Sequence, residues 1–325
     1  MKMKSHSRRK FMKNGSQVVL VLLLAPQLIA CKGKSEVAAT AVMNEELKKL
    51  MDFSISGDES YQIRNLAGNL WTFEERGGTI GFDVSDDGIA IVDTQFPEQS
   101  QHLVDAIREQ TDRSIDLLIN THHHGDHTSG NNVFKKLIKD SVAHSNSKKN
   151  QLSRAEGSDK VDQIFFPETV FEDSWKTNLG SETVLMNYYG AGHTNGDAIT
   201  AFVNTNAVHL GDLVFNRRYP YIDKSAGANI QNWIVVLDKV LESHNTETKY
   251  IFGHSDNGYD LVGNYEDIKA FQNYLERLLE FGEKSFKAGK TLEELNAETT
   301  MIPGAEEWKG DGILRSLDAV YQELS

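Results

Sequence analysis

Residues 121–132 read THHHGDHTSGNN, and four of the chain's eleven histidines lie within six consecutive positions of this stretch. The residues before it, IDLLINT (115–121), form a short apolar run that predicts a buried strand. Ligands of α/β sheets commonly bind beyond the carboxyl ends of strands. The stretch is therefore either a solvated, loosely metal-binding loop or a metal site at a strand end.

Three later segments repeat the arrangement of an apolar run followed by a polar side chain. His193 follows TVLMNYYGAG, Asp212 ends AVHLGD, and His254 follows KYIFG. A glycine directly precedes each of them, which lets the backbone turn sharply and lets a ligand lie close. With the histidine-rich stretch, four strand ends carry potential metal ligands, and such a coincidence is improbable by chance. The sequence therefore favours a metal site.

Imidazole and carboxylate groups suit zinc, with iron or manganese as alternatives. A catalytic zinc takes about three protein ligands and keeps one position open for water. Seven candidate ligands therefore divide into two metal sites that share one carboxylate, and bound water with a pKa of about 7 supplies hydroxide without a serine or cysteine nucleophile. The candidates are His122, His124, Asp126, His127, His193, Asp212 and His254.

HHHGDH (122–127) resembles the H-x-H-x-D-H motif of the metallo-β-lactamase-fold hydrolases. GAGHTNGD, GDLVF and FGHS resemble the later motifs of that superfamily, in the same order, so the resemblance covers about residues 60–260. It implies a four-layer αβ/βα sandwich. It also implies the following roles: His122, His124 and His193 hold one metal, Asp126, His127 and His254 hold the second, and Asp212 bridges them.

The resemblance further implies that a metal-bridging hydroxide attacks a carbonyl and that Asp126 orients this nucleophile as the catalytic carboxylate. In one subclass of the β-lactamases a cysteine stands at the bridging position, whereas here it is Asp212, as in glyoxalase II-like, lactonase-like and phosphodiesterase-like members. We therefore expect a zinc-dependent hydrolase of a small ester, thioester, lactone or amide. The alternatives are a β-lactamase, a phosphodiesterase or sulfatase, and a non-catalytic zinc-binding lipoprotein.

Other polar residues allow two interpretations. Asp93 and Asp197 either accept hydrogen bonds that orient ligand imidazoles or are ordinary turn carboxylates. The segment NRRYPYID (216–223) either overhangs the metals or is a solvated loop. In the first case its side chains bind a substrate carboxylate or ring; the candidates are Arg217, Arg218, Tyr219 and Tyr221.

The N-terminus has the layout of a targeting segment. SRRKFMK (7–13) resembles a twin-arginine export signal, and an apolar run of twelve residues follows at 18–29, too short to span a bilayer. LIAC (28–31) resembles a lipobox, which implies lipid on Cys31, the only cysteine. We expect a signal peptide over residues 1–30, a tether over 31–53 and a lipoprotein anchored in the periplasm or cell envelope.

The charge balance bears on the partners. The chain has 34 basic and 47 acidic residues; removing the six basic residues of positions 1–30 leaves 28 against 47, a balance of −19. Such a surface repels nucleic acid. We expect a small-molecule substrate, contact with the membrane only through Cys31, and no nucleic acid partner. The sequence leaves the oligomeric state open.

The remaining chain predicts an α/β domain. Residues 61–94 predict antiparallel strands around an Asp-Asp-Gly turn. IQNWIVVLDKVLES (230–243) predicts an amphipathic helix, and TLEE (291–294) predicts a capping box. We therefore expect a metallo-β-lactamase-like catalytic domain over residues 54–263 and a helical extension packed on it over 264–325.

Overall fold

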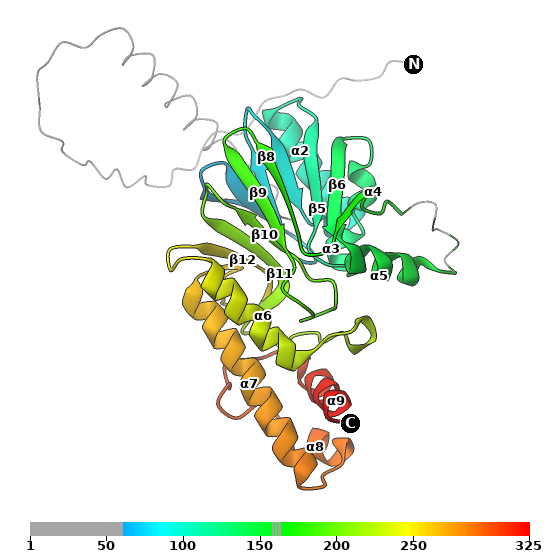
Figure 1. Ribbon diagram of the computed structural model, residues 1–325, viewed down its shortest axis with the longest axis vertical. Helices are drawn as coiled ribbons and strands as arrows, with labels where there is room; N and C mark the ends of the chain where they lie inside the picture. The colour runs from blue at the N-terminus through cyan, green and yellow to red at the C-terminus, as the bar shows by residue number, and fades with distance from the viewer. Residues whose placement is uncertain (1–60, 158, 160, 162–163) are drawn as a thin grey trace, which may run out of the picture. The chain divides into compact units, whose positions relative to one another are not determined.

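The computed structural model describes residues 61–157, 159, 161 and 164–325, all of which belong to one compact unit. The signal peptide, Cys31 and the tether expected from the sequence lie outside these residues. The described residues form two mixed β-sheets with helices on their outer faces (Figure 1).

The first sheet has seven strands in the order β1-β2-β3-β4-β5-β6-β7. These are β1 (Gln62–Ala67), β2 (Leu70–Glu74), β3 (Ile80–Val84), β4 (Ile89–Val92), β5 (Ile115–Asn120), β6 (Ile138–His144) and β7 (Thr169–Phe171). β1 to β4 pair antiparallel, and β4 to β7 pair parallel. Parallel neighbours need crossover connections, and the helices that make them are α2 (Pro97–Gln110), α3 (Gly125–Thr128), α4 (Asn131–Phe134) and α5 (Ser145–Ala155).

The second sheet has six strands in the order β13-β12-β11-β10-β9-β8. These are β8 (Ser174–Leu179), β9 (Glu182–Asn187), β10 (Ile199–Phe202), β11 (Ala207–Asn216), β12 (Lys249–Ser255) and β13 (Val262–Gly263). β11 and β12 pair parallel, and their crossover is α6 (Ile230–Ser243). The chain ends in α7 (Tyr265–Lys287), α8 (Leu292–Glu298) and α9 (Ile313–Leu324).

Three apolar clusters hold the layers together. Phe82 and Leu103 belong to the cluster between the first sheet and α2. Ile119 and Phe202 belong to the cluster between the two sheets. The third and largest cluster joins the second sheet to α6, α7 and α9, so the C-terminal helices share a core with this sheet. The order helix, sheet, sheet, helix confirms the predicted four-layer sandwich with C-terminal helices.

Most of the predicted elements are present. The antiparallel strands of residues 61–94, the strand before the histidines, α6 and the capping box of α8 are confirmed. α5 was not predicted because the residues it buries, Ser145, Ser147, Gln151 and Ala155, are polar or small and leave no apolar period.

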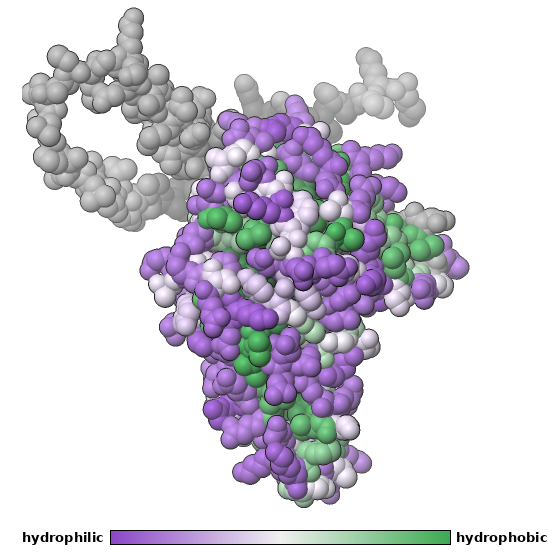
Figure 2. Space-filling view, viewed as in Figure 1, coloured by the Kyte–Doolittle hydropathy of each residue, from purple (hydrophilic) through white to green (hydrophobic). Residues whose placement is uncertain are grey.

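The face shown in Figure 2 is mostly hydrophilic, with small, separate apolar areas. This agrees with the burial of the helical apolar stripes in the core. None of the helices among the described residues is long and apolar enough to cross a membrane.

Candidate metal centre

The four sequence motifs meet at one edge of the two sheets. The histidine-rich stretch follows β5, His193 lies in the loop between β9 and β10, and Asp212 and His254 lie on β11 and β12. The structure brings all seven predicted ligands together. They form two groups, one of His122, His124, His193 and Asp212 and the other of Asp126, His127 and His254.

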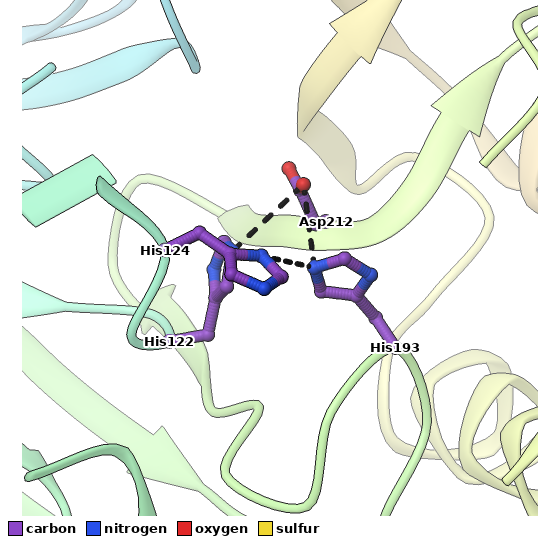
Figure 3. Close-up of side chains that lie close together, drawn as sticks. All are labelled: His122, His124, His193 and Asp212. Atoms are coloured by element: carbon purple, nitrogen blue, oxygen red, sulfur yellow. Dashed lines mark hydrogen bonds and ion pairs between the residues drawn. The ribbon is translucent and has the colours of Figure 1, made fainter. Parts of the chain in front are cut away.

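The first group surrounds a single point. His124 Nδ1 lies 3.1 Å from His122 Nε2 and 2.8 Å from His193 Nε2. Asp212 Oδ2 lies 3.8 Å from His122 Nε2 and 3.5 Å from His193 Nε2. Figure 3 shows the three imidazoles converging on each other beside the Asp212 carboxylate. Ligand atoms about 2.0–2.1 Å from a tetrahedral zinc are about 3.3 Å apart, so these spacings fit such an ion.

The second group lies on the other side of the Asp212 carboxylate. Asp212 Oδ1 is 3.0 Å from His127 Nε2 and 3.4 Å from His254 Nε2. Asp126 Oδ2 completes this group, 3.1 Å from His254 Nε2 and 3.8 Å from His127 Nε2. The two oxygens of Asp212 therefore face different groups, which is the arrangement that a bridging carboxylate requires.

Two buried atoms of the site test whether a cation fits it. His127 Nε2 and Asp212 Oδ1 lie 3.0 Å apart, but their geometry is not that of a hydrogen bond, and neither atom has another hydrogen-bond partner. A buried polar atom without a partner costs about 1–3 kcal/mol. A divalent cation between them would satisfy both atoms, so the residues present fit a metal.

Two glycines shape the backbone around Asp212. A Cβ at Gly253 would lie 2.0 Å from Asp212 Oδ1, which no side chain tolerates. Gly211 has a φ of +51°, and a Cβ there would lie 2.5 Å from Thr121 Oγ1. The register of β11 against β12 shifts on both sides of Gly211. Such an irregularity redirects the next side chain, which here is Asp212.

Asp93 supports both ligand groups. Its Oδ2 accepts a hydrogen bond from His127 Nδ1 at 2.7 Å and another from the Thr121 hydroxyl at 2.7 Å. Thr121 Oγ1 in turn lies 3.0 Å from His122 Nδ1. Of the two interpretations that the sequence left open for Asp93, the geometry favours the imidazole-orienting one.

Asp197 does not contact a predicted ligand directly but binds Thr194, the residue after His193. Its carboxylate accepts hydrogen bonds from Thr194 N at 2.7 Å and Thr194 Oγ1 at 2.6 Å. It therefore fixes the loop next to His193 and does not contact the imidazole. His193 Nδ1 donates instead to the backbone carbonyl of Tyr221 at 2.6 Å.

Asp223 was not among the predicted site residues. Its Oδ2 lies 2.8 Å from His124 Nε2, the ring nitrogen that faces away from the first group. Asp223 ends the segment NRRYPYID, which the sequence predicted either to overhang the metals or to be a solvated loop, but it was not among the candidates of that segment. The two residues are 99 positions apart, so no local pattern indicates their contact. Hydrogen bonds to Ser225 and Ala226 hold the carboxylate in place.

The electrostatics of the site favour ligation. Burial lowers the pKa of His193 to about 3 and that of His122 well below its usual value, which keeps both imidazoles neutral. Burial opposes the charge on His127, but Asp212, Asp93 and Asp126 raise its pKa well above its usual value. Metal ligands must be deprotonated, and a cation at this site would take the place of the proton on His127.

Of the four residues predicted to bind substrate, two contact the C-terminal helix α7 and two are exposed. Tyr219 is only 5% exposed and packs against Tyr274, and Arg217 pairs with Asp267 at 2.9 Å. Neither side chain is directed at the metal groups, which corrects the expectation that both bind substrate. Arg218 is exposed. Tyr221 is 41% exposed, and its ring centroid lies 5.3 Å from that of His124.

The family model "Metallo-beta-lactamase superfamily" matches residues 76–254, which include all seven predicted ligands. The chain belongs to this superfamily. It is 21% identical over 247 residues to metallo-beta-lactamase IND-1 of Chryseobacterium indologenes, covering 75% of this chain and 93% of that protein. The superfamily is hydrolytic, so membership and the His/Asp clusters together identify a metal-binding hydrolase fold.

Solved structures show the same fold at low identity. The stereoselective inverting sec-alkylsulfatase Pisa1 from Pseudomonas sp. matches with a TM-score of 0.64 and 14% identity, over 80% of this chain and 49% of the sulfatase. The chain thus spans about half the length of that protein. A metallo-beta-lactamase from Pontibacter korlensis matches with a TM-score of 0.56 and 14% identity, over 66% of this chain and 99% of the other.

Proposed function

We propose that the protein is a dizinc hydrolase that cleaves an ester, thioester, lactone or amide bond of a small substrate. The observation that carries this proposal is the orientation of Asp212, whose two oxygens face two separate groups of ligands. Histidine and carboxylate donors at tetrahedral spacing suit zinc, and iron or manganese is compatible with the same donors.

When bound, zinc lowers the pKa of a coordinated water to about 7 and polarises the bond to be cleaved. The residues of the chain then position the water and the ligand imidazoles. Asp126 has the most exposed side chain of the ligand carboxylates, at 31% against 5% for Asp212. It therefore faces the open side of the centre, where it would hold and orient the attacking water. Asp93 holds the His127 imidazole, and Asp223 holds the His124 imidazole.

The test measures metal content and turnover on the same preparation. We expect about two zinc ions per chain by elemental analysis and hydrolysis of one class within a panel of esters, thioesters, lactones, phosphodiesters, sulfate esters and one cephalosporin. Chelation should abolish this activity, and added zinc should restore it. A chain that binds metal and hydrolyses nothing in the panel is a zinc-binding protein instead, and a chain that binds no metal tightly contradicts the dizinc proposal outright.

β-Lactam hydrolysis is the second candidate. The likeness to metallo-beta-lactamase IND-1 over 93% of that protein supports it. Against it stands Asp212 at the position where one subclass of the β-lactamases has cysteine. The cephalosporin in the panel decides between the two candidates.

The N-terminal sequence supports a location outside the cytoplasm, with the protein anchored through lipid on Cys31. A Cys31→Ser variant should move from the membrane fraction to the soluble fraction, and replacing Arg8 and Arg9 by lysine should reduce its export. Unchanged fractionation of both variants contradicts the anchor and the export route.

A further inference from the structure

The C-terminal helices reach the loop that covers the metal centre. Tyr219 N donates to Lys309 O at 2.9 Å, and Lys309 N donates to Arg217 O at 3.0 Å. A Cβ at Gly312 would lie 2.6 Å from Tyr219 Cβ, so the start of α9 lies directly against this loop. The same loop carries Tyr221, whose carbonyl accepts the hydrogen bond from His193.

This docking places Arg315, in the first turn of α9, beside Tyr221. The Arg315 guanidinium lies 5.7 Å from the centroid of the Tyr221 ring. The Tyr221 ring in turn lies 5.3 Å from His124 and 6.2 Å from His193, centroid to centroid. A guanidinium over a tyrosine face is held by the cation–π attraction. Arg315 is thus one aromatic ring removed from two predicted ligands of the first metal.

No carboxylate in the described part of the chain neutralises the charge of Arg315, in contrast to two other cations of the neighbouring loop. Arg217 pairs with Asp267 at 2.9 Å, and Lys224 pairs with Glu323 at 3.0 Å. Among the described residues, no carboxylate forms an ion pair with Arg315, and both Arg315 and Tyr221 are exposed. In a chain with a net charge of −13, an unpaired cation beside the centre is a local attraction for an anion.

We propose that Arg315 and Tyr221 recognise an oxyanion on the part of the substrate that is not cleaved. The guanidinium fork binds a carboxylate or a tetrahedral oxyanion through paired hydrogen bonds. The Tyr221 ring packs against the apolar portion between that oxyanion and the bond at the metals. The substrate class is therefore a small ester, thioester, lactone or amide that carries an anionic end. This inference rests on the proposed hydrolase function and adds Arg315 as a specificity-determining residue.

The test compares matched substrates on the zinc-loaded full chain. Mono-p-nitrophenyl glutarate carries a carboxylate, its carboxamide analogue is neutral, and a sulfonate-ended ester of equal length is the second anion. The proteins are the wild type, Arg315→Gln, Arg315→Lys and the control Lys287→Gln, which removes an exposed cation of α7 that pairs with Glu283. The ratio of kcat/KM between anionic and neutral esters is the readout.

We expect Arg315→Gln to lower that ratio about tenfold, through KM and not through kcat, because a hydrogen bond to a charged group is lost. Arg315→Lys should retain part of the preference, and Lys287→Gln should match the wild type. If the site is specific for carboxylates, Arg315→Gln should lower kcat/KM only for the glutarate ester. If it accepts oxyanions in general, the variant should lower kcat/KM for both anionic esters. Equal effects of Arg315→Gln on anionic and neutral esters overturn the inference.

A second measurement separates failure of this inference from failure of the hydrolase proposal. If the wild type cleaves none of these esters, calorimetry measures the binding of 3-phenylpropionate and 3-phenylpropanesulfonate to the chelator-treated full chain, where no metal can bind the anion. The anion site predicts binding that Arg315→Gln weakens about tenfold. Binding that is absent from the wild type, or equal in both proteins, contradicts it.

Discussion

Asp93 Oδ2 lies 2.7 Å from His127 Nδ1, and both side chains are fully buried. The same oxygen accepts the Thr121 hydroxyl, which contacts His122. One carboxylate behind the centre therefore orients an imidazole in each ligand group. Asp93 has a φ of 66°, a left-handed conformation that costs a non-glycine residue about 1–3 kcal/mol. The position of this carboxylate is held by the surrounding structure despite that cost.

Asp93→Asn should weaken metal binding about 10- to 100-fold, because the amide cannot accept from His127 and Thr121 with the strength of a carboxylate. Competition against a chelator of known affinity measures the change. Asp105→Asn is the matched control, because Asp105 is an exposed aspartate of α2 that contacts Gln101. Equal affinity in Asp93→Asn and the wild type would show that the contact does not support the metals.

Removing single ligands should separate the two metal positions. His193→Ala takes a donor only from the first group, and His254→Ala takes a donor only from the second. Each variant should retain about one tightly bound ion, whereas Asp212→Ala should weaken both positions because its oxygens face both groups. Elemental analysis after dialysis gives the counts. If His193→Ala and His254→Ala each keep two ions, these histidines do not belong to separate metal positions. If Asp212→Ala keeps two ions, Asp212 does not bridge the metals.

Gly253→Ala should disable the centre while leaving the fold intact. The new methyl group would lie 2.0 Å from Asp212 Oδ1 and must displace that carboxylate. We expect metal affinity to fall at least tenfold, because a displaced carboxylate no longer lies where the ligand groups need it. The far-ultraviolet circular dichroism should not change. Lys249→Ala, at the exposed start of the same strand β12, controls for changes in strand stability. Normal metal content in Gly253→Ala would mean that Asp212 is not held where the structure has it.

The clustering of the seven predicted ligands could be inferred from the sequence because each follows an apolar run within a few residues. Such runs identify strands locally, and strand ends in layered α/β folds gather at one edge. The division of seven donors into two groups followed from the resemblance to the superfamily, and the spacings around Asp212 agree with it.

The residues that surround the ligands could not be predicted in this way. The contact between His124 and Asp223 joins positions 99 residues apart, and Arg315 reaches Tyr221 only because α9 docks on the loop after β11. The predicted roles of Arg217 and Tyr219 failed for the same reason: Asp267 and Tyr274, which engage them, come from α7. Closeness in sequence to Asp212 does not determine which side chains of that loop face the metals.

Asp83, remote from the metal centre, makes stability depend on pH. It is 3% exposed, and its Oδ1 is buried without a hydrogen bond. Burial, with a contribution from the charge of Glu182, raises its pKa from 3.8 to about 7. The folded protein therefore binds this proton more tightly than the unfolded chain does. The stabilisation is fully present below about pH 4 and is lost as the pH rises through about 7.

Asp83→Asn should remove this dependence, because the amide is neutral at every pH. At pH 8 the variant should be more stable than the wild type by about 1–3 kcal/mol, and at pH 5 the two should differ by less. Urea unfolding at both pH values, under the same metal conditions, measures the difference. Asp86→Asn in the adjacent exposed turn is the control. Equal differences between the variant and the wild type at pH 5 and at pH 8 would show that Asp83 is charged in the folded protein throughout this range.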